Sequence, residues 1–270
     1  MGQDWPSAGK FMRMIAAIAV IGTLIVSSAS VDGVARASVS RVIEIYEQYG
    51  TYTLDAPPPE MQPIVLSLPE QFLYGSSKEG SRNWGVNILT YYPSFTSPQD
   101  SINASFGLKC VGICNGQILI SVQNRKHSIS STSPNMGDFI ARTELKWSKT
   151  PPYPSNVEVR DIEPSEGFDE AFEHVTNAIV FPLTNKYQLP AQTKRTYLRK
   201  AGSSYYDLTA ICNVNNLKIS CILHFSLDCN PAIYITVNGV DGSYLHLATD
   251  IKVKTDRFVS AMVKKSACAY

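Results

Sequence analysis

The stretch Tyr205–Val237 reads YYDLTAICNVNNLKISCILHFSLDCNPAIYITV and predicts three consecutive β-strands. Apolar and β-branched residues fill Tyr205–Cys212, Leu217–Phe225 and Ala232–Val237, and turn-forming Asn, Asp and Pro gather between these runs. Strands that follow one another through short turns pair in antiparallel fashion, because parallel strands need a longer crossover. The stretch therefore favours an α+β fold over a fold built from βαβ units.

Further strands and two helices are predicted outside this stretch. The other expected strands are Ile64–Leu68, Gln71–Tyr74, Gly85–Tyr92, Gly116–Gln123, Gly137–Trp147, Thr196–Lys200 and Tyr244–Leu247. Asn238-Gly239 is a hairpin-turn signal. One helix is expected from Ser165, which can cap it, to Ile179, because apolar residues recur between them at helical spacing. The second helix is expected over Ile251–Met262.

Four segments follow from this pattern. They are a leader over residues 1–37, a proline-containing linker over 38–60, and two α+β parts over 61–150 and 151–270. The fold class expected is α+β, with antiparallel sheets and two main helices. Two similar α+β halves are one arrangement that fits this order of elements, although no sequence repeat supports it.

The leader has the order of a secretory signal. Lys10 and Arg13 precede the uncharged apolar run Met14–Val26, and small residues follow, with cleavage expected after Ser30 or Ala37. The run has 13 residues, fewer than the roughly 20 that a helix needs to cross a bilayer. A cleaved signal is favoured, and an uncleaved membrane anchor is the alternative. No cysteine follows the run, which argues against a lipid anchor.

Six cysteines also favour export to an oxidising compartment. They are Cys110, Cys114, Cys212, Cys221, Cys229 and Cys268. Cys212 and Cys221 flank a turn-rich segment and are expected to pair across a hairpin, and Cys110 and Cys114 are expected to close a small loop. Free buried thiols are the alternative. A zinc site is disfavoured, because the sequence has no CxxC pair.

No common catalytic motif is present in the sequence. It lacks G-x-S-x-G, HExxH, a P-loop and a G-x-G-x-x-G after a strand. His127, His174, His224 and His246 are scattered, and we interpret His174 as a surface residue and His224 as a structural one. The net charge of +1 gives no reason to expect nucleic acid. We expect no enzyme, no cofactor and no metal, and membrane contact only through an uncleaved leader.

Two segments of opposite charge suggest where a partner binds. Glu158–Glu173 holds seven carboxylates and one cation, while Lys186–Lys200 holds five cations. Either the two segments are solvated faces that attract each other, or the acidic one docks a basic partner. Exposed Tyr is also favoured at interfaces. The residues predicted to contact a partner are Glu158, Asp161, Glu163, Glu166, Tyr92 and Tyr153, and the loop after Tyr92 is a second candidate region.

Two pairs of segments share a strand pattern with a known family. In Leu66–Phe72 and Trp84–Phe95, a Leu-Pro-aromatic strand precedes a strand that ends in Tyr-Pro. In Asp207–Cys212 and Cys221–Phe225, two cysteine-bearing strands precede a final helix. This pattern resembles immunity proteins of bacterial type VI secretion systems, above all those against lipase effectors. The resemblance implies a periplasmic protein without catalytic residues that binds a toxic effector and blocks it.

The leading hypothesis is a periplasmic immunity protein that occludes a type VI toxin, with a phospholipase or lipase as the expected effector. An envelope structural or secretion-accessory protein is a second hypothesis, and an uncleaved leader with self-association would favour it. An exported hydrolase without a standard motif is a third. A cluster of His, Asp and Ser side chains in a pocket would favour that third hypothesis.

Overall fold

A computed structural model describes part of the 270 residues of the protein. The described residues are 40–47, 62–75, 82–98, 116–149, 157–180, 188–215 and 218–268, and all of them belong to the unit Val39–Tyr270. The predictions for the leader, for the Cys110–Cys114 loop and for Tyr153 lie outside the described residues. Within these ranges, no helix has the length and apolar character needed to span a membrane.

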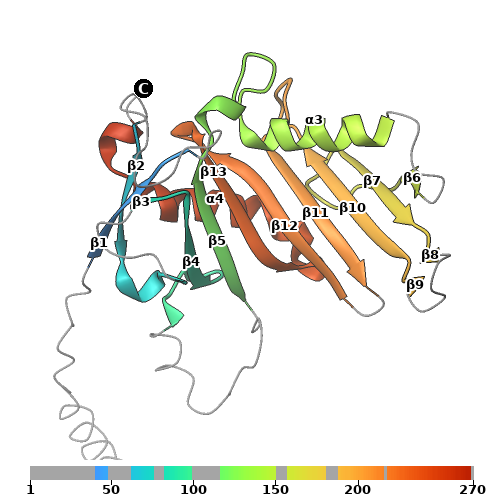
Figure 1. The fold of residues 1–270 in the computed structure, drawn as a ribbon, viewed down its shortest axis with the longest axis horizontal. Coiled ribbons are helices and arrows are strands. Elements are labelled where there is room, and N and C mark those ends of the chain that lie inside the picture. The colour runs from blue at the N-terminus through green and yellow to red at the C-terminus, as the bar shows by residue number, and fades with distance from the viewer. Residues whose placement is uncertain are drawn as a thin grey trace, which may run out of the picture. The chain divides into compact units, whose positions relative to one another are not determined.

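An eight-stranded antiparallel sheet dominates the described residues (Figure 1). Its strands are β4 (Gly85–Tyr91), β5 (Gln117–Asn124), β6 (Val157–Asp161), β7 (Glu170–Thr176), β10 (Gln192–Arg199), β11 (Leu208–Asn215), β12 (Lys218–Leu227) and β13 (Asn230–Asp241). They are ordered β4-β5-β13-β12-β11-β10-β7-β6. We call this the large sheet. The strands β10 to β13 lie side by side in chain order, as the sequence predicts.

The hairpin of β11 and β12 contains the predicted disulfide. Cys212 and Cys221 are directly opposite each other in the register of the two strands, with a Cα–Cα distance of 4.0 Å and an S–S bond of 2.08 Å. A second disulfide joins Cys229 to Cys268 and was not predicted. Every cysteine in the described ranges is therefore bonded.

Two smaller sheets accompany the large one. The strands β1 (Ser40–Ile45), β2 (Ile64–Pro69) and β3 (Arg82–Asn83) form a three-stranded sheet, in which β1 pairs antiparallel with β2 and parallel with β3. A two-stranded ladder joins β8 (Ile179–Val180) to β9 (Gln188–Leu189). The linker predicted for 38–60 is wrong over β1, because Ile43 and Ile45 are buried in the core.

Two α-helices cover opposite faces of the large sheet (Figure 1). They are α3 (Met136–Lys149) and α4 (Ala248–Ser260). The short 3-10 helices are η1 (Glu70–Phe72), η2 (Lys126–Ser128), η3 (Gly242–Leu247) and η4 (Lys265–Ala267). The consecutive residues Tyr197 and Leu198 show the two faces, because Tyr197 packs in the cluster with α4 and Leu198 in the cluster with α3. The α+β class and the final helix are as predicted.

The helix predicted over Ser165–Ile179 is wrong, because this segment contributes β7 and β8. Its apolar spacing resembles a helix because both faces of β7 are covered. Ala171 is buried on the α4 side and Phe172 on the α3 side. A strand covered on both faces buries consecutive residues, and the simple alternation of a half-buried strand is then lost.

The strand predicted over Gly137–Trp147 is wrong, because it forms most of α3. A capping residue stands just before α3, and the strand prediction for Gly137–Trp147 did not take it into account. The Asn135 side-chain oxygen accepts a hydrogen bond from the Asp138 backbone N–H at 2.9 Å, as at a helix N-cap. Asp138 in turn forms an ion pair with Arg142 one turn later.

Three local predictions also differ from the structure. Asn238-Gly239 is no hairpin turn: it lies inside β13, where Gly239 has a φ of 87° at a shift in the register with β12, and a glycine bulge has these properties. Residues 244–247 belong to η3, and residues 71–72 belong to η1. The large sheet takes strands from both 61–150 and 151–270, so these two parts do not form separate sheets.

Candidate functional site

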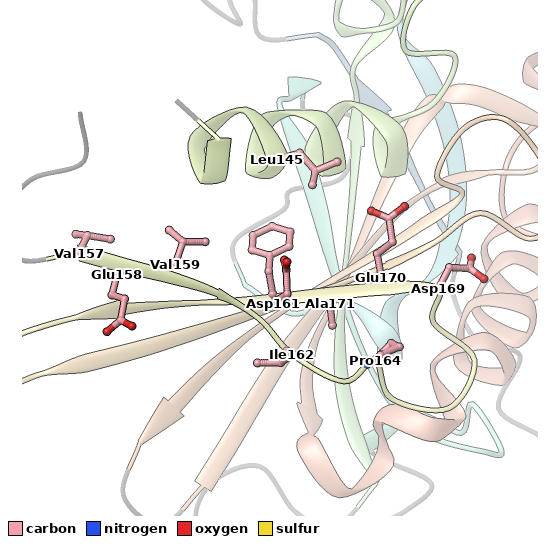
Figure 2. Close-up of a pocket in the computed structure, with 11 residues that line it drawn as sticks. Leu145, Val157, Glu158, Val159, Asp161, Ile162, Pro164, Asp169, Glu170 and Ala171 are labelled. Carbon is pink, nitrogen blue, oxygen red and sulfur yellow. The ribbon is translucent and has the colours of Figure 1, made fainter. Parts of the chain in front are cut away.

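An open hollow of about 870 Å³ lies along β6, the last strand at one edge of the large sheet (Figure 2). Its lining residues are Leu145, Val157, Glu158, Val159, Asp161, Ile162, Pro164, Asp169, Glu170, Ala171 and Phe172. Val157, Glu158 and Val159 are consecutive, and the side chains of a strand alternate between its two faces. A hollow that reaches all three residues lies beside the edge of the strand. We call it the edge hollow.

One wall of the edge hollow is apolar. Figure 2 shows Leu145 pointing from α3 toward the sheet, with Val157 and Val159 on the same side and Glu158 on the other. Phe172 of β7 belongs to the same buried cluster as Leu145 and Val159. Val157 and Val159 are only half-buried. This side of the hollow therefore offers an accessible hydrocarbon surface beneath α3.

The helix above the edge hollow is fastened by polar contacts. Glu144 accepts a hydrogen bond from the Lys194 ammonium of β10 at 2.7 Å. The buried carboxylate of Asp138 accepts one from the Tyr206 backbone N–H at 3.0 Å. These contacts tie the first half of α3 to the connection between β10 and β11 and the second half to β10, so Leu145 has a fixed position over β6.

The segment that leaves β6 carries unpaired negative charge. Asp161 is the last residue of β6 and residues 162–169 connect it to β7; we call residues 161–169 together the acidic loop. Its carboxylates are Asp161, Glu163, Glu166 and Asp169, and all four residues are exposed. None of the four forms an ion pair with another described residue. The acidic loop therefore presents negative charge that this part of the chain does not neutralise.

The other three carboxylates of the acidic segment do have cationic partners. Glu158 pairs with Arg160 at 2.7 Å, and the hydrogen bonds from Arg160 lower the pKa of Glu158. Glu170 pairs with Lys200 at 2.7 Å and Glu173 with Arg195 at 3.1 Å. The sequence allows two interpretations of the acidic segment, attraction to the basic segment or docking of a partner. Attraction to the basic segment explains the ion pairs of Glu170 and Glu173. The carboxylates of the acidic loop are left for the other interpretation, a charged docking surface.

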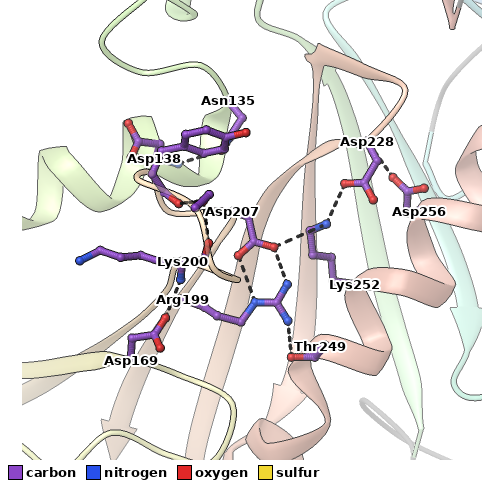
Figure 3. A network of polar contacts seen from close by, with 12 residues as sticks. Asn135, Asp138, Asp169, Arg199, Lys200, Asp207, Asp228, Thr249, Lys252 and Asp256 are labelled. Carbon is purple, nitrogen blue, oxygen red and sulfur yellow. Dashed lines mark hydrogen bonds and ion pairs between the residues drawn. The ribbon is translucent and has the colours of Figure 1, made fainter.

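Both the backbone and one aromatic ring hold the end of the acidic loop in place. Phe168 is buried, with its ring centroid 5.7 Å from that of Tyr197. The Asp169 carboxylate accepts a hydrogen bond from the Lys200 backbone N–H at 2.7 Å (Figure 3). Gly167 has a φ of +86°, which few other residues adopt without strain. The loop is thus anchored at its Asp169 end, while Asp161, Glu163 and Glu166 remain exposed to solvent.

A polar network next to this anchor joins β10, the residue before β11, and α4 (Figure 3). Arg199 binds the Asp207 carboxylate with two nitrogens, and its Nε–Oδ1 distance is 3.0 Å. Lys252 of α4 lies 3.8 Å from Asp207 and 2.8 Å from Asp228. The two cations of this network, Arg199 and Lys252, are each paired with a carboxylate, so we interpret the network as support for the anchor.

The other predicted contact residue of the described chain, Tyr92, lies at the opposite edge of the large sheet, just after β4. Its hydroxyl donates a hydrogen bond to Asp250, and Lys254 lies 5.2 Å from its ring centroid. Desolvation and the Asp250 carboxylate raise the pKa of Tyr92 to about 12. The structure does not bring Tyr92 to the acidic loop, and a role for it in partner binding stays a prediction.

The histidines do not assemble a reactive group in the described ranges. His174 lies on β7, with no hydrogen-bond partner for its Nδ1. His224 of β12 contacts the Tyr234 hydroxyl through Nδ1 at 2.6 Å, and burial lowers the pKa of His224 to about 4. Among the described residues, no three His, Cys, Asp or Glu side chains are placed to hold a metal ion. That the protein is no enzyme stays a prediction.

Sequence reasoning identified the charges of this site but missed its apolar wall. Leu145 was assigned to a strand, and Val157 and Val159 were not singled out. The run Val157-Glu158-Val159-Arg160 alternates apolar and charged residues, a pattern typical of a strand with one exposed face. Asp169 lies in the segment predicted as a helix, and it is not among the predicted contact residues.

Comparison with known proteins gives a distant likeness to one solved structure. No protein-family model matches the chain, and no curated protein matches it. A solved structure described as "The Structure of Smlt3025, an immunity protein of the Stenotrophomonas maltophilia type IV secretion system" is similar to it with a TM-score of 0.46 and 8% sequence identity, over 74% of this chain and 90% of that chain. A likeness at this level carries no argument about function, which therefore rests on the site.

Proposed function

We propose that this protein is an exported immunity protein that neutralises a toxin by binding it through the acidic loop. The observation that carries the proposal is the set of four exposed carboxylates without an ion pair in the described chain, next to an open hollow that has one apolar wall. Glu170 and Glu173 of the same segment have cationic partners from β10 and the residue after it. An uncompensated group of like charges beside accessible apolar surface is suited to a partner of opposite charge.

The anchoring of the acidic loop supports tight binding. Phe168 and Asp169 hold one end of the loop in the folded chain. A segment that is already ordered loses less conformational entropy when it binds, so more of the contact energy becomes affinity. Complementary charge also speeds the encounter of two proteins. Both properties serve an inhibitor that must reach a toxin before the toxin reaches its target.

An oxidising compartment is part of the proposal. The disulfides Cys212–Cys221 and Cys229–Cys268 are of the kind that persists outside the cytosol. We place the protein in the periplasm, with the predicted leader as its export signal. A type VI system as the source of the toxin, and a phospholipase or lipase as its activity, rest on the sequence resemblance alone. The edge hollow has no His or Ser in its lining, so it does not favour the hydrolase alternative.

A growth assay tests this function. The full chain and a chain without residues 1–37 are expressed beside each periplasm-directed protein encoded next to the gene. We expect one neighbour to arrest growth when it is exported, and only the full chain to restore growth. If no exported neighbour is toxic, or if neither chain restores growth against one that is, the immunity proposal is wrong. If the chain without residues 1–37 restores growth and the full chain does not, the periplasmic location is contradicted.

A further inference from the structure

The edge of β6 is open for pairing in the described part of the chain. β6 pairs with β7 on one side, and no described strand pairs with its other side. An unpaired strand edge presents a row of backbone donors and acceptors that another extended segment can use. The edge hollow lies along this row and leaves space beside it.

The dimensions of β6 suit a short extended segment. The strand has five residues, which span about 17 Å at the rise of a β-strand. Beyond Asp161 the register with β7 ends, and the Ile162 backbone N–H donates to the Ala171 carbonyl at 3.1 Å as the chain turns away. The hollow continues past this point to Asp169 and Glu170. A segment added to β6 would therefore reach the acidic loop with one of its ends.

The two faces of an added segment would meet different chemistry. On the α3 side, alternate side chains would contact the apolar wall made by Leu145 and Val159 (Figure 2). Near that wall is Trp147, whose side chain is 69% exposed in a second hollow that also reaches Val157. An exposed Trp beside a hollow is a frequent anchor in protein interfaces. At the Asp161 end, the segment would meet uncompensated carboxylates.

Charge selects among the occupants of this edge. A second copy of the chain would bring its own Glu158 and Asp161 to the same edge, which places like charges together. A segment rich in Lys or Arg is instead attracted by the acidic loop. Charged residues on an edge strand also prevent unwanted self-pairing, and three of the five residues of β6 are charged. The occupant that fits is therefore a basic segment of a protein.

We infer that the toxin binds with an extended basic segment that adds to β6 as a further strand of the large sheet. Its apolar side chains contact Leu145 and Val159 at alternate positions, and its cationic side chains contact the acidic loop. This inference rests on the proposed function and specifies the chemistry of the partner. It also predicts that backbone pairing, and not charge alone, contributes to the affinity.

A peptide titration of the full chain tests the chemistry of the segment. The probes are acetyl-KVTVKVK-amide, its acidic counterpart acetyl-EVTVEVE-amide, and a basic analogue that is N-methylated at alternate backbone nitrogens. We expect the basic probe to shift the amide resonances of residues 157–161, and the N-methylated analogue to bind about tenfold more weakly or worse, since it lacks the donors that pair with a strand edge. Equal binding by all three probes, or shifts confined to other strands, would overturn the inference.

Proline substitution along β6 tests the pairing itself. Alternate residues of an edge strand direct their N–H toward the open side, and the others direct it toward the neighbouring strand. Val157→Pro and Val159→Pro therefore form one pair of variants, and Glu158→Pro and Arg160→Pro the other. The Ile162 N–H donates toward β7, so by alternation the N–H groups of Val157 and Val159 face the open side. The Val157 and Val159 variants should therefore keep the wild-type melting temperature and lose at least about tenfold in affinity for the basic probe, because Pro lacks the donor and blocks the edge.

The outcomes separate this inference from the proposed function. If the well-folded proline variants still bind the probe and still restore growth, strand addition is wrong while the immunity function stands. If the chain restores growth against no exported neighbour but binds the basic probe at β6, the immunity function is wrong and the edge site stands.

Discussion

The centre and the β6 edge of the large sheet are built from the same antiparallel pairing but differ in their surroundings. In the centre, Leu223, Phe225 and Ile235 are fully buried, and a disulfide joins β11 to β12. At the edge, β6 has no buried side chain, and the acidic loop carries four carboxylates that form no ion pair with the described residues. The residues that stabilise this fold and the residues that we propose for recognition are therefore different sets, so mutations can separate the two roles.

The largest expected effect on stability is at Phe225, in the centre. Phe225→Ala leaves a cavity in a site with no solvent access, and we expect the free energy of unfolding to fall by about 3–5 kcal/mol. Phe139→Ala is the matched control, because Phe139 lies on the outer face of α3 and is 38% exposed. Urea denaturation measures both variants. A loss at Phe139 that equals the loss at Phe225 would contradict the contrast between core and surface.

The central disulfide should have the next largest effect. Replacing Cys212 and Cys221 together with Ala opens a link between residues nine apart in the sequence. The restored freedom of the unfolded chain should lower the free energy of unfolding by about 2–3 kcal/mol. Circular dichroism during thermal unfolding reports the change, and the affinity of the variant for its partner should stay at the wild-type value. A pair of Ala substitutions with no loss of stability would show that the bond does not strengthen the centre.

Acid should weaken the centre through His224. Burial lowers the pKa of His224 to about 4 in the folded chain, against about 6.5 in an unfolded one. Between these values the unfolded state binds a proton that the folded state does not, so the contribution of His224 to stability falls as the pH is lowered. The loss approaches about 1.4 kcal/mol per pH unit below pH 6.5.

Two His→Gln variants isolate the contribution of His224 to the pH dependence of stability. Between pH 7 and about pH 4.5, the free energy of unfolding should fall by about 2 kcal/mol less in His224→Gln than in the wild-type chain. The exposed His246 serves as the control, and His246→Gln should keep the wild-type dependence. Denaturation at the two pH values measures the difference. Equal pH dependence in wild type and His224→Gln would contradict the burial of a neutral imidazole in the centre.

The smallest expected effect on stability is at the acidic loop. Asp161→Asn, Glu163→Gln and Glu166→Gln together remove three exposed charges that have no ion pair in the described residues. The free energy of unfolding should change by less than about 0.5 kcal/mol. A large loss in the triple variant would mean that these carboxylates hold the fold together, which would remove the reason to assign them to a partner.

Sequence reasoning succeeded in the centre because the signals there are local. The turn-rich sequence around Asn213 predicts a hairpin, and the pairing of β11 with β12 places Cys212 opposite Cys221. Neither inference needs knowledge of distant segments. By contrast, Asn238-Gly239 was misread because the same residues that make a tight turn also make a bulge, and only the pairing of β13 with β12 separates these cases.

It failed next to the edge because burial there depends on distant elements. Ala171 and Phe172 are both buried since different helices cover the two faces of β7. The sequence around them contains no information about that covering. The same holds for charge: the acidic segment was recognised, but the pairing of Glu173 with Arg195 follows from the register of β7 and β10. Which carboxylates stay unpaired was therefore beyond a reading of the sequence.

The claim that the acidic loop binds a basic toxin is tested most directly by the affinity of the purified complex. The triple variant of the acidic loop is compared with the control Glu44→Gln, Glu70→Gln and Asp241→Asn, which removes the same charge from other elements. Because each exposed ion pair adds about 0.5–1 kcal/mol, we expect the triple variant to bind roughly 10–100-fold more weakly, and the control to bind like the wild type. Equal affinities of the two variants would contradict the account.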